Sequence, residues 1–217
     1  MHTHIRMIIL GMLVATAMCV AGCNIVGPAL VLADGPPTQD AKFELDPERP
    51  TLVFIDDRLP RLGRRQLRNL IAESCQNTLL ERKVVLKAID YRAGFAISDR
   101  ETPGQPMDIV TIARTVGAQI VIFATVDGFS LSPDGATMTP NAALRVKVID
   151  TNKESPRVWP AEAEGFPLMV SLNQRPTPLP RAPADVMRAE NAFAEQVGTA
   201  VSKLFYEHET RESVGGR

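Results

Sequence analysis

Residues 51–57, with the sequence TLVFIDD, decide the fold class of this chain. The run is β-branched and aromatic and ends in two aspartates, which is typical of a strand buried on both faces. Helical spacing follows over residues 62–82, where Leu67 and Ile71 share one apolar stripe and charged residues lie between them. A second short apolar run covers residues 84–86. Strand, helix and strand in this order predict a βαβ unit with a parallel pair of strands.

The second half of the chain predicts a helix, several strands and a final helix. Asp108 and Gly117 are start and stop signals around a short helical stripe. The expected strands cover residues 119–129, 143–150 and 157–159, with residues 167–172 as a candidate continuation of the last of them. Short turns between these strands indicate an antiparallel meander, and a helix then begins near Asp185. The order β-α-β-α-β-β-β-α predicts one α/β domain with two layers and a mixed sheet.

The first 22 residues predict an export signal. His2, His4 and Arg6 form a polar, basic start, and residues 7–20 follow as an apolar run. That run is shorter than the roughly 20 residues that a helix needs to cross a bilayer. A charged start, a short apolar core and small residues at its end are together typical of a secretion signal.

Cys23 closes this signal in a pattern that resembles the lipobox of bacterial lipoproteins. Residues 20–23 have the sequence VAGC, and in that family the cysteine becomes the diacylated first residue of the mature chain. Cys19 fits less well because Met18 precedes it. The resemblance implies anchoring by acyl chains such as palmitate, and Asn24 in place of an aspartate implies the outer membrane. A plain signal peptide or an uncleaved anchor is the alternative.

Four segments follow from these features. We expect a lipoprotein signal peptide at 1–22, a lipidated tether at 23–50, a periplasmic α/β domain at 51–207 and a flexible tail at 208–217. Cleavage before Cys23 would leave Cys75 as the one unlipidated cysteine, so no intramolecular disulfide could form. Cys75 lies on the apolar stripe of the predicted helix, which favours a small buried side chain.

Composition argues against several classes of function. The formal net charge of −1 gives no electrostatic reason to expect nucleic acid as a partner. After removal of the signal, His208 is the one remaining histidine, and its position favours a solvated helix end over a catalytic or zinc-binding role. Glycine-rich nucleotide-binding motifs are missing from the sequence. We therefore expect that the protein binds no metal ion and no cofactor and that it is not an enzyme.

Asp56 and Asp57 are the most enzyme-like residues in the chain. They end the first predicted strand, where open α/β sheets often place functional groups. Adjacent residues of an extended chain point to opposite faces, so the two side chains are poorly placed to share one ion. A turn role is the simpler interpretation. A cleft at the strand ends near Asp56 and Asp127 would instead bind a small molecule or a peptide, and a hydrolase is the remaining alternative.

Two features are candidates for contact with a partner. Trp159 is the one tryptophan, and it either packs on the sheet or serves as an exposed anchor in an interface. Pro176, Pro178 and Pro180 lie in a proline-rich stretch that favours an extended conformation. Such a stretch either links a strand to a helix or is recognised by another protein.

The order of segments also resembles a family of envelope proteins. A helix ending in Gly117-Ala118, a strand over 120–126 and the strand 144–150 with its Val-Ile-Asp end followed by a polar turn look like the periplasmic α/β domain of curli-assembly lipoproteins. They look equally like lipoprotein activators of penicillin-binding proteins. The resemblance covers residues 51–207, and the extra amphipathic hairpin that would build a secretion pore is not evident.

What this resemblance implies is a non-enzymatic envelope lipoprotein that acts by protein–protein contact. Its partners would be a membrane, through the lipid anchor, and another envelope protein, in an assembly, structural or accessory role. The expected location is the outer membrane, with the domain facing the periplasm. A periplasmic module that binds a small molecule or a peptide is the alternative.

Overall fold

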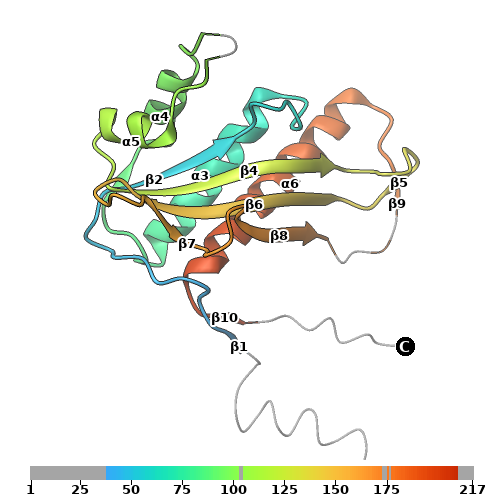
Figure 1. Ribbon diagram of the computed structural model, residues 1–217. Coiled ribbons are helices and arrows are strands. Elements are labelled where there is room, and N and C mark those ends of the chain that lie inside the picture. The colour runs from blue at the N-terminus through green and yellow to red at the C-terminus, as the bar shows by residue number, and fades with distance from the viewer. Residues whose placement is uncertain (1–37, 103–104, 173–174, 176, 210–217) are drawn as a thin grey trace, which may run out of the picture. The chain divides into compact units, whose positions relative to one another are not determined.

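The computed structural model describes residues 38–102, 105–172, 175 and 177–209, in two units. The larger unit, Ala41–Tyr206, contains a six-stranded sheet and the helices that cover it (Figure 1). In the smaller unit, β1 (Thr38–Gln39) pairs antiparallel with β10 (His208–Glu209). Among the described residues, no helix combines the length and the apolar character needed to cross a membrane.

The sheet is mixed, as the sequence predicts. β2, next to the edge strand β3, lies between two parallel neighbours, and antiparallel strands complete the sheet beyond β4. β7 and β8 pair with successive parts of β6, so that they form one interrupted edge strand and confirm the expected continuation. A separate two-stranded ladder joins β5 to β9. The strands are β2 (Thr51–Asp56), β3 (Ala88–Ile89), β4 (Ile120–Ser130), β5 (Thr137–Met138), β6 (Asn141–Asp150), β7 (Arg157–Trp159), β8 (Phe166–Ser171) and β9 (Thr177–Pro178).

Two long helices, α3 (Arg65–Glu81) and α6 (Pro183–Ser202), cover one face of the sheet (Figure 1). They cross at Gly198, where an added Cβ would collide with the carbonyl oxygen of Ile71. Glycine at this position therefore permits the close approach of the helices. Cys75 on α3 is completely buried, as its place on the apolar stripe predicts.

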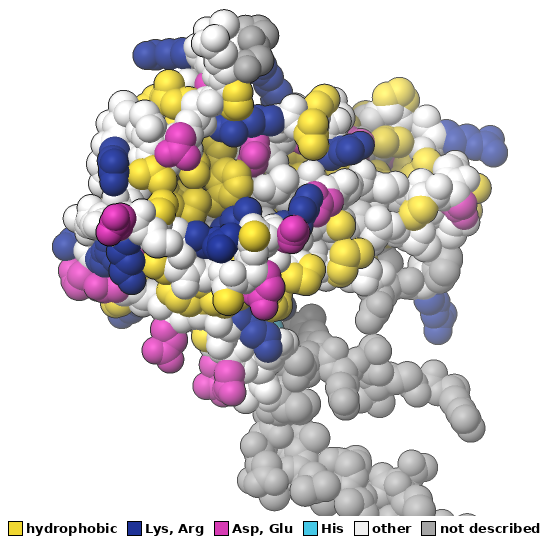
Figure 2. All heavy atoms as spheres, in the orientation of Figure 1, with side chains coloured by type: hydrophobic (Ala, Val, Ile, Leu, Met, Phe, Trp, Pro, Cys, Tyr) yellow, Lys and Arg dark blue, Asp and Glu magenta, His cyan; other side chains and the backbone are white. Residues whose placement is uncertain are grey.

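The opposite face carries two short helices over β2, α4 (Tyr91–Ser98) and α5 (Ile109–Thr115). Phe95 of α4 meets Phe54 of β2 edge to face, with 5.3 Å between ring centroids. Asp108 caps α5 by accepting a hydrogen bond from the amide of Val110, as expected. Among the described residues, no helix covers the part of this face formed by β6 and β8 (Figures 1 and 2). A single α/β domain with a mixed sheet is thus confirmed.

The strand expected at residues 84–86 is wrong, because the partner of β2 begins at Ala88. The carbonyl oxygen of Leu79 accepts hydrogen bonds from the amides of both Val84 and Val85, so these residues still belong to the end of α3. Lys83 between them and the helix has a φ of 56°, in the left-handed region that ends helices. The apolar residues of this segment therefore cover the end of the helix.

Helix α4 is absent from the predicted order of elements. Asp90 begins it by accepting a hydrogen bond from the amide of Arg92. Its fourth residue, Gly94, weakens the helical signal in the sequence. The structure explains this glycine, since a Cβ there would lie 3.2 Å from the side chain of Leu52 on β2.

The larger unit begins at Ala41, ten residues before the start of the domain that the sequence predicts at residue 51. Phe43 and Leu45 pack against the hydrophobic core. The carbonyl oxygen of Leu204, in the short 3₁₀ helix η1 (Lys203–Phe205), accepts a hydrogen bond of 2.7 Å from the amide of Lys42. Apolar burial and backbone pairing thus make this segment part of the domain.

Candidate functional site

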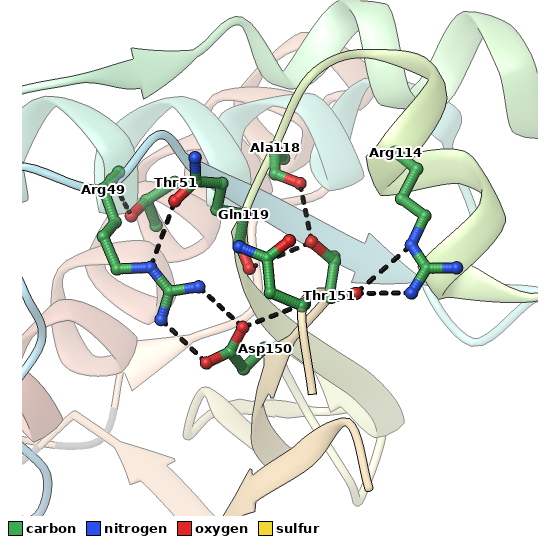
Figure 3. Close-up of polar contacts among 8 residues, drawn as sticks. Arg49, Thr51, Arg114, Ala118, Gln119, Asp150 and Thr151 are labelled. Carbon is green, nitrogen blue, oxygen red and sulfur yellow. Dashed lines mark hydrogen bonds and ion pairs between the residues drawn. The ribbon is translucent and has the colours of Figure 1, made fainter. Parts of the chain in front are cut away.

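A partly buried ion pair joins Arg49, just before β2, to the buried Asp150 at the end of β6 (Figure 3). The two guanidinium NH2 groups donate to the carboxylate over 2.7 Å and 2.6 Å, and Nε donates to the side chain of Gln119 over 3.2 Å. The hydrogen bonds from Arg49 hold the pKa of Asp150 below its ordinary value. Beside the pair, Thr151 donates to the carbonyl of Ala118. We call Arg49 and Asp150 the amino-end pair. Its charged groups are hydrogen-bonded to each other, and the pair joins the segment before β2 to the end of β6.

The opposite end of β2 opens into a cavity of about 580 Å³, which we call the β2 cleft. Phe54 and Ile55 supply apolar lining, and the walls come from the loop after β2, the first turns of α3 and the end of α4. β2 is followed by α3 on one face, whereas α4 and α5 lie on the other. Open α/β sheets bind ligands in a crevice at the carboxyl ends of their strands, at the point where the connections from two adjacent strands run to opposite faces of the sheet.

On the α3 side of the β2 cleft, two arginines share one carboxylate. Asp99 lies 3.5 Å from Arg65 and 3.2 Å from Arg68. The guanidinium of Arg68 lies 4.0 Å from the centroid of the Phe95 ring, and its buried Nε has no hydrogen-bond partner among the described residues. This wall therefore carries one more positive than negative charge.

On the loop side, two carboxylates share one arginine. Arg58 lies 3.6 Å from Asp56 and 3.1 Å from Glu101, and it also donates to the carbonyl of Met107. The side chains of Asp56 and Glu101 are only 14% and 13% exposed. Asp57 adds a further carboxylate, which accepts hydrogen bonds from the amides of the turn after β2. This wall is negative overall.

The structure separates the aspartates that the sequence suggested for one cleft. Asp56 and Asp57 both line the β2 cleft, because β2 ends at Asp56 and strict alternation of side chains ends with it. Asp127 does not line it. Its carboxylate instead forms a two-point ion pair with Arg145 on the neighbouring strand, with distances of 2.7 Å and 2.6 Å. No group of three or more His, Cys, Asp or Glu side chains in the described residues is arranged to hold a metal ion.

The outer side of β8 is a second candidate site. Within the described part of the chain no strand pairs with it. The amide of Leu172 donates to the carbonyl of Pro140 on the β6 side, so antiparallel alternation turns the backbone groups of Met169 and Ser171 outward. Pro167 fits this phase, because its missing N–H would also face outward. Met169 has a 73% exposed side chain, the largest fraction among the exposed hydrophobic residues of the described chain.

The structure engages Trp159 in packing rather than leaving it on an open surface. Its ring is half-buried and lies 5.1 Å from Phe166, 6.0 Å from Phe43 and 6.2 Å from Phe205, measured between centroids. These residues come from four separate segments of the larger unit. The packing interpretation of Trp159 thus accounts for its environment.

The proline-rich stretch is described in part. Pro178 is exposed and belongs to β9, where it pairs with Thr137 of β5. Pro180 is half-buried. Pro176 lies outside the described residues.

Of Cys23, Cys75 and His208, the structure describes the last two. Cys23, the expected lipidation site, lies outside the described residues. Burial raises the pKa of the Cys75 thiol, which opposes formation of a reactive thiolate. His208 lies in β10 rather than at the end of the last helix.

Sequence reasoning found part of the loop-side wall of the β2 cleft and missed the wall on the α3 side. The two aspartates after β2 marked the site, but Arg68 and Glu101 are distant from them in sequence. Arg68 interrupts the pattern as a cation next to the apolar stripe of α3, and that is the one signal that could have drawn attention to it. Glu101 carries no comparable signal, because its loop lies outside regular structure.

Comparison with known proteins leaves the family open. No protein-family model and no curated protein matches the chain. Among solved structures, a PelC dodecamer from Paraburkholderia phytofirmans is 14% identical with a TM-score of 0.39, over 78% of this chain and 97% of that one. The LpoB C-terminal domain from Salmonella enterica is 16% identical with a TM-score of 0.35, over 68% and 92%. A lipoprotein from Neisseria meningitidis is 11% identical with a TM-score of 0.34, over 70% and 99%. Likeness at this level carries no argument about function.

Proposed function

We propose that this chain is an exported, lipid-anchored protein of the bacterial envelope whose α/β unit binds another envelope protein without catalysing a reaction. The anchor rests on the sequence of the first 23 residues, and the binding role rests on the open edge of β8. The outer membrane is the proposed location, with the unit in the periplasm.

The anchor follows from the signal and from Cys23. Each buried CH₂ of an acyl chain contributes about 0.8 kcal/mol, so a cysteine that carries several chains stays in a membrane. A protein held in this way searches a surface rather than a volume, which favours contact with other proteins of the same membrane.

The edge of β8 is the observation that supports protein binding. Outward N–H and C=O groups at Met169 and Ser171 form a template that an extended segment of another protein can extend by one strand. Such pairing takes its affinity from main-chain hydrogen bonds and its specificity from alternate side chains. The side chain of Met169 lies on the uncovered face beside Ala143, where a partner side chain can bury it.

Replacement of Cys23 tests the anchor. A chain with Cys23→Ser should lose metabolic labelling by a fatty-acid probe and should leave the membrane fraction, whereas Cys19→Ser should retain both. If the wild-type chain takes up no fatty acid, or if Cys23→Ser fractionates with the membrane as before, the proposed anchor is wrong.

Site-specific crosslinking tests the edge. A photoreactive amino acid at Met169 should give one discrete adduct in cells, and the same amino acid at Met187, which is 46% exposed on α6, should not. Adding Ser171→Pro removes one outward N–H without touching the bonds to β6, and it should reduce the Met169 adduct severalfold. Equal adducts at the two positions, or an adduct insensitive to Ser171→Pro, would exclude strand addition at this edge.

A ligand-binding module is the second candidate, and the β2 cleft is the observation that favours it. The two roles are compatible, because the cleft and the edge of β8 share no residues. The ligand that would fit the cleft follows from its charges.

A further inference from the structure

We propose that the β2 cleft binds a zwitterionic ligand of amino-acid or short-peptide size. Its carboxylate would lie on the wall with Arg65 and Arg68, and its ammonium group on the wall with Asp56 and Glu101. This inference rests on the second candidate function, ligand binding in the β2 cleft, and names the class of ligand; it does not depend on the lipid anchor or on the edge of β8.

The positive wall has unused hydrogen-bonding capacity. Arginine carries five N–H donors, and those of Arg68 reach only Asp99 among the described residues, although the side chain is 14% exposed. A buried donor without an acceptor costs free energy, which an incoming carboxylate would recover. Arg65, 83% exposed at the start of α3, can turn toward the same ligand because its own contact with Asp99 is 3.5 Å long.

The start of α3 adds to this wall. Arg64 precedes the helix and provides no side-chain cap, and the first turn contains no acidic residue. The guanidinium of Arg64 instead reaches Glu190 and Asn191 on α6. The amide of Leu67 donates to the carbonyl of Arg64, but no side chain caps the amides before it, so they and the positive end of the helix dipole can reinforce an anion held by Arg65 and Arg68.

The negative wall is complementary. Asp56 and Glu101 are largely buried and divide the single guanidinium of Arg58, which leaves one negative charge without a matching cation. Asp57, adjacent to Asp56, makes this wall more negative still. An ammonium group supplies three donors and a positive charge, so it satisfies the carboxylates in a way that water does only in part.

Only a ligand with both charges fits both walls. A simple anion would meet the carboxylates of the loop side, and a simple cation would meet Arg65 and Arg68. The cavity of about 580 Å³ falls in the range of pockets for small ligands and accommodates a di- or tripeptide. Pro60 and Pro106, which are exposed and line the cavity, favour an apolar side chain between the two charged ends.

Titration calorimetry with the full lipidated chain in detergent tests the proposal. The probes are leucine, Leu-Gly and Leu-Gly-Gly with free ends, together with N-acetyl-Leu-Gly and Leu-Gly-amide. The best free-ended probe should bind saturably, and capping either end should weaken binding at least about tenfold, since each charged hydrogen bond contributes on that scale. The length series distinguishes a free amino acid from a peptide as the ligand.

Paired variants assign each end of the ligand to its wall. Arg65→Gln should weaken Leu-Gly but leave Leu-Gly-amide unchanged, and Asp56→Asn should weaken Leu-Gly but leave N-acetyl-Leu-Gly unchanged. Arg188→Gln and Asp127→Asn change the same charges outside the cleft and should leave binding as it is. The proposal is overturned if no free-ended probe binds below about 10 mM, if capped probes bind as well as free ones, or if the control variants weaken binding as much as the cleft variants.

Discussion

Arginine and aspartate side chains lie at both ends of β2, but they have different roles at the two ends. At the amino end, the guanidinium of Arg49 faces one carboxylate with both NH2 groups, and the side chain of Asp150 is 5% exposed. At the carboxyl end, Asp99 is divided between two arginines, and Arg68 keeps a buried N–H without a partner in the described chain. Arginine and aspartate thus close one end of the strand and leave the other unsatisfied.

Topology explains the difference. At the amino end, the segment before β2, the start of β4 and the end of β6 converge, so that one ion pair fastens three parts of the chain. At the carboxyl end, the connection from β2 leads to α3 on one face, the connection from β3 passes through α4 and α5 on the other, and a cavity stays between them. Satisfied polar groups stabilise a fold, whereas unsatisfied ones in a cavity are available to a ligand.

Breaking the amino-end pair should have the largest effect on stability. Asp150→Ala leaves the guanidinium of Arg49 without its buried partner, and the loss of one member of such a pair costs about 3 kcal/mol. Urea unfolding should show that decrease in the free energy of unfolding. Asp99→Ala in the β2 cleft should cost less than about 1 kcal/mol, because that carboxylate is 38% exposed. Equal losses in the two variants would contradict the contrast between the two ends.

Acid should weaken the amino-end pair selectively. The pKa of Asp150 is lowered in the folded state, first by its hydrogen bonds from Arg49. The stabilisation is therefore present above the unfolded pKa, near 3.8, and is lost as the pH falls through the folded value. Thermal unfolding between pH 5 and pH 2 should show a smaller decrease of Tm in Asp150→Asn than in the wild-type chain. Parallel curves for the two proteins would show that the pair does not respond to acid.

The sequence indicated the functional residues at the amino end of β2 less clearly than those at its carboxyl end. Arg49 and Asp150 are about one hundred positions apart, and neither lies in a local pattern, so only the register of β2, β4 and β6 brings them together. Asp56 was recognisable because it ends a buried strand, and the order of elements was recoverable because apolar periodicity is local. What periodicity could not supply was α4, whose Gly94 is required by a contact with Leu52.

The start of the domain shows the same limit. Glycines and prolines within residues 24–39 suggested a tether that continues to residue 50, yet Phe43 and Leu45 pack against the core. Two apolar side chains at a spacing of two residues give a weak signal on their own. Their role depends on a surface that the rest of the chain builds.

Removing Arg68 should raise the free energy of unfolding, whereas breaking the amino-end pair should lower it. Arg68→Met deletes the unpaired Nε, keeps a side chain over the Phe95 ring and leaves Asp99 in contact with Arg65. We expect the free energy of unfolding to rise by about 1 kcal/mol, because the cost of the buried unsatisfied donor disappears. Binding of Leu-Gly should be lost in the same variant. Destabilisation by more than about 1 kcal/mol would mean that Arg68 serves the fold in the way that Arg49 does.

The smallest effect should come from an ion pair with ideal geometry on an exposed surface. Arg145 and Asp127 meet at two points over 2.6 Å and 2.7 Å, as closely as the amino-end pair does, but their side chains are 41% and 36% exposed. Water and salt screen such a pair, so Arg145→Gln should change the free energy of unfolding least among these variants, by an amount close to the error of the measurement. Measurement in 1 M sodium chloride should remove even this difference, whereas the loss in Asp150→Ala should persist. Suppose that Arg145→Gln lowered the free energy of unfolding as much as Asp150→Ala. Distance rather than burial would then determine how much these ion pairs stabilise the fold, and the difference between the two ends of β2 would need another cause.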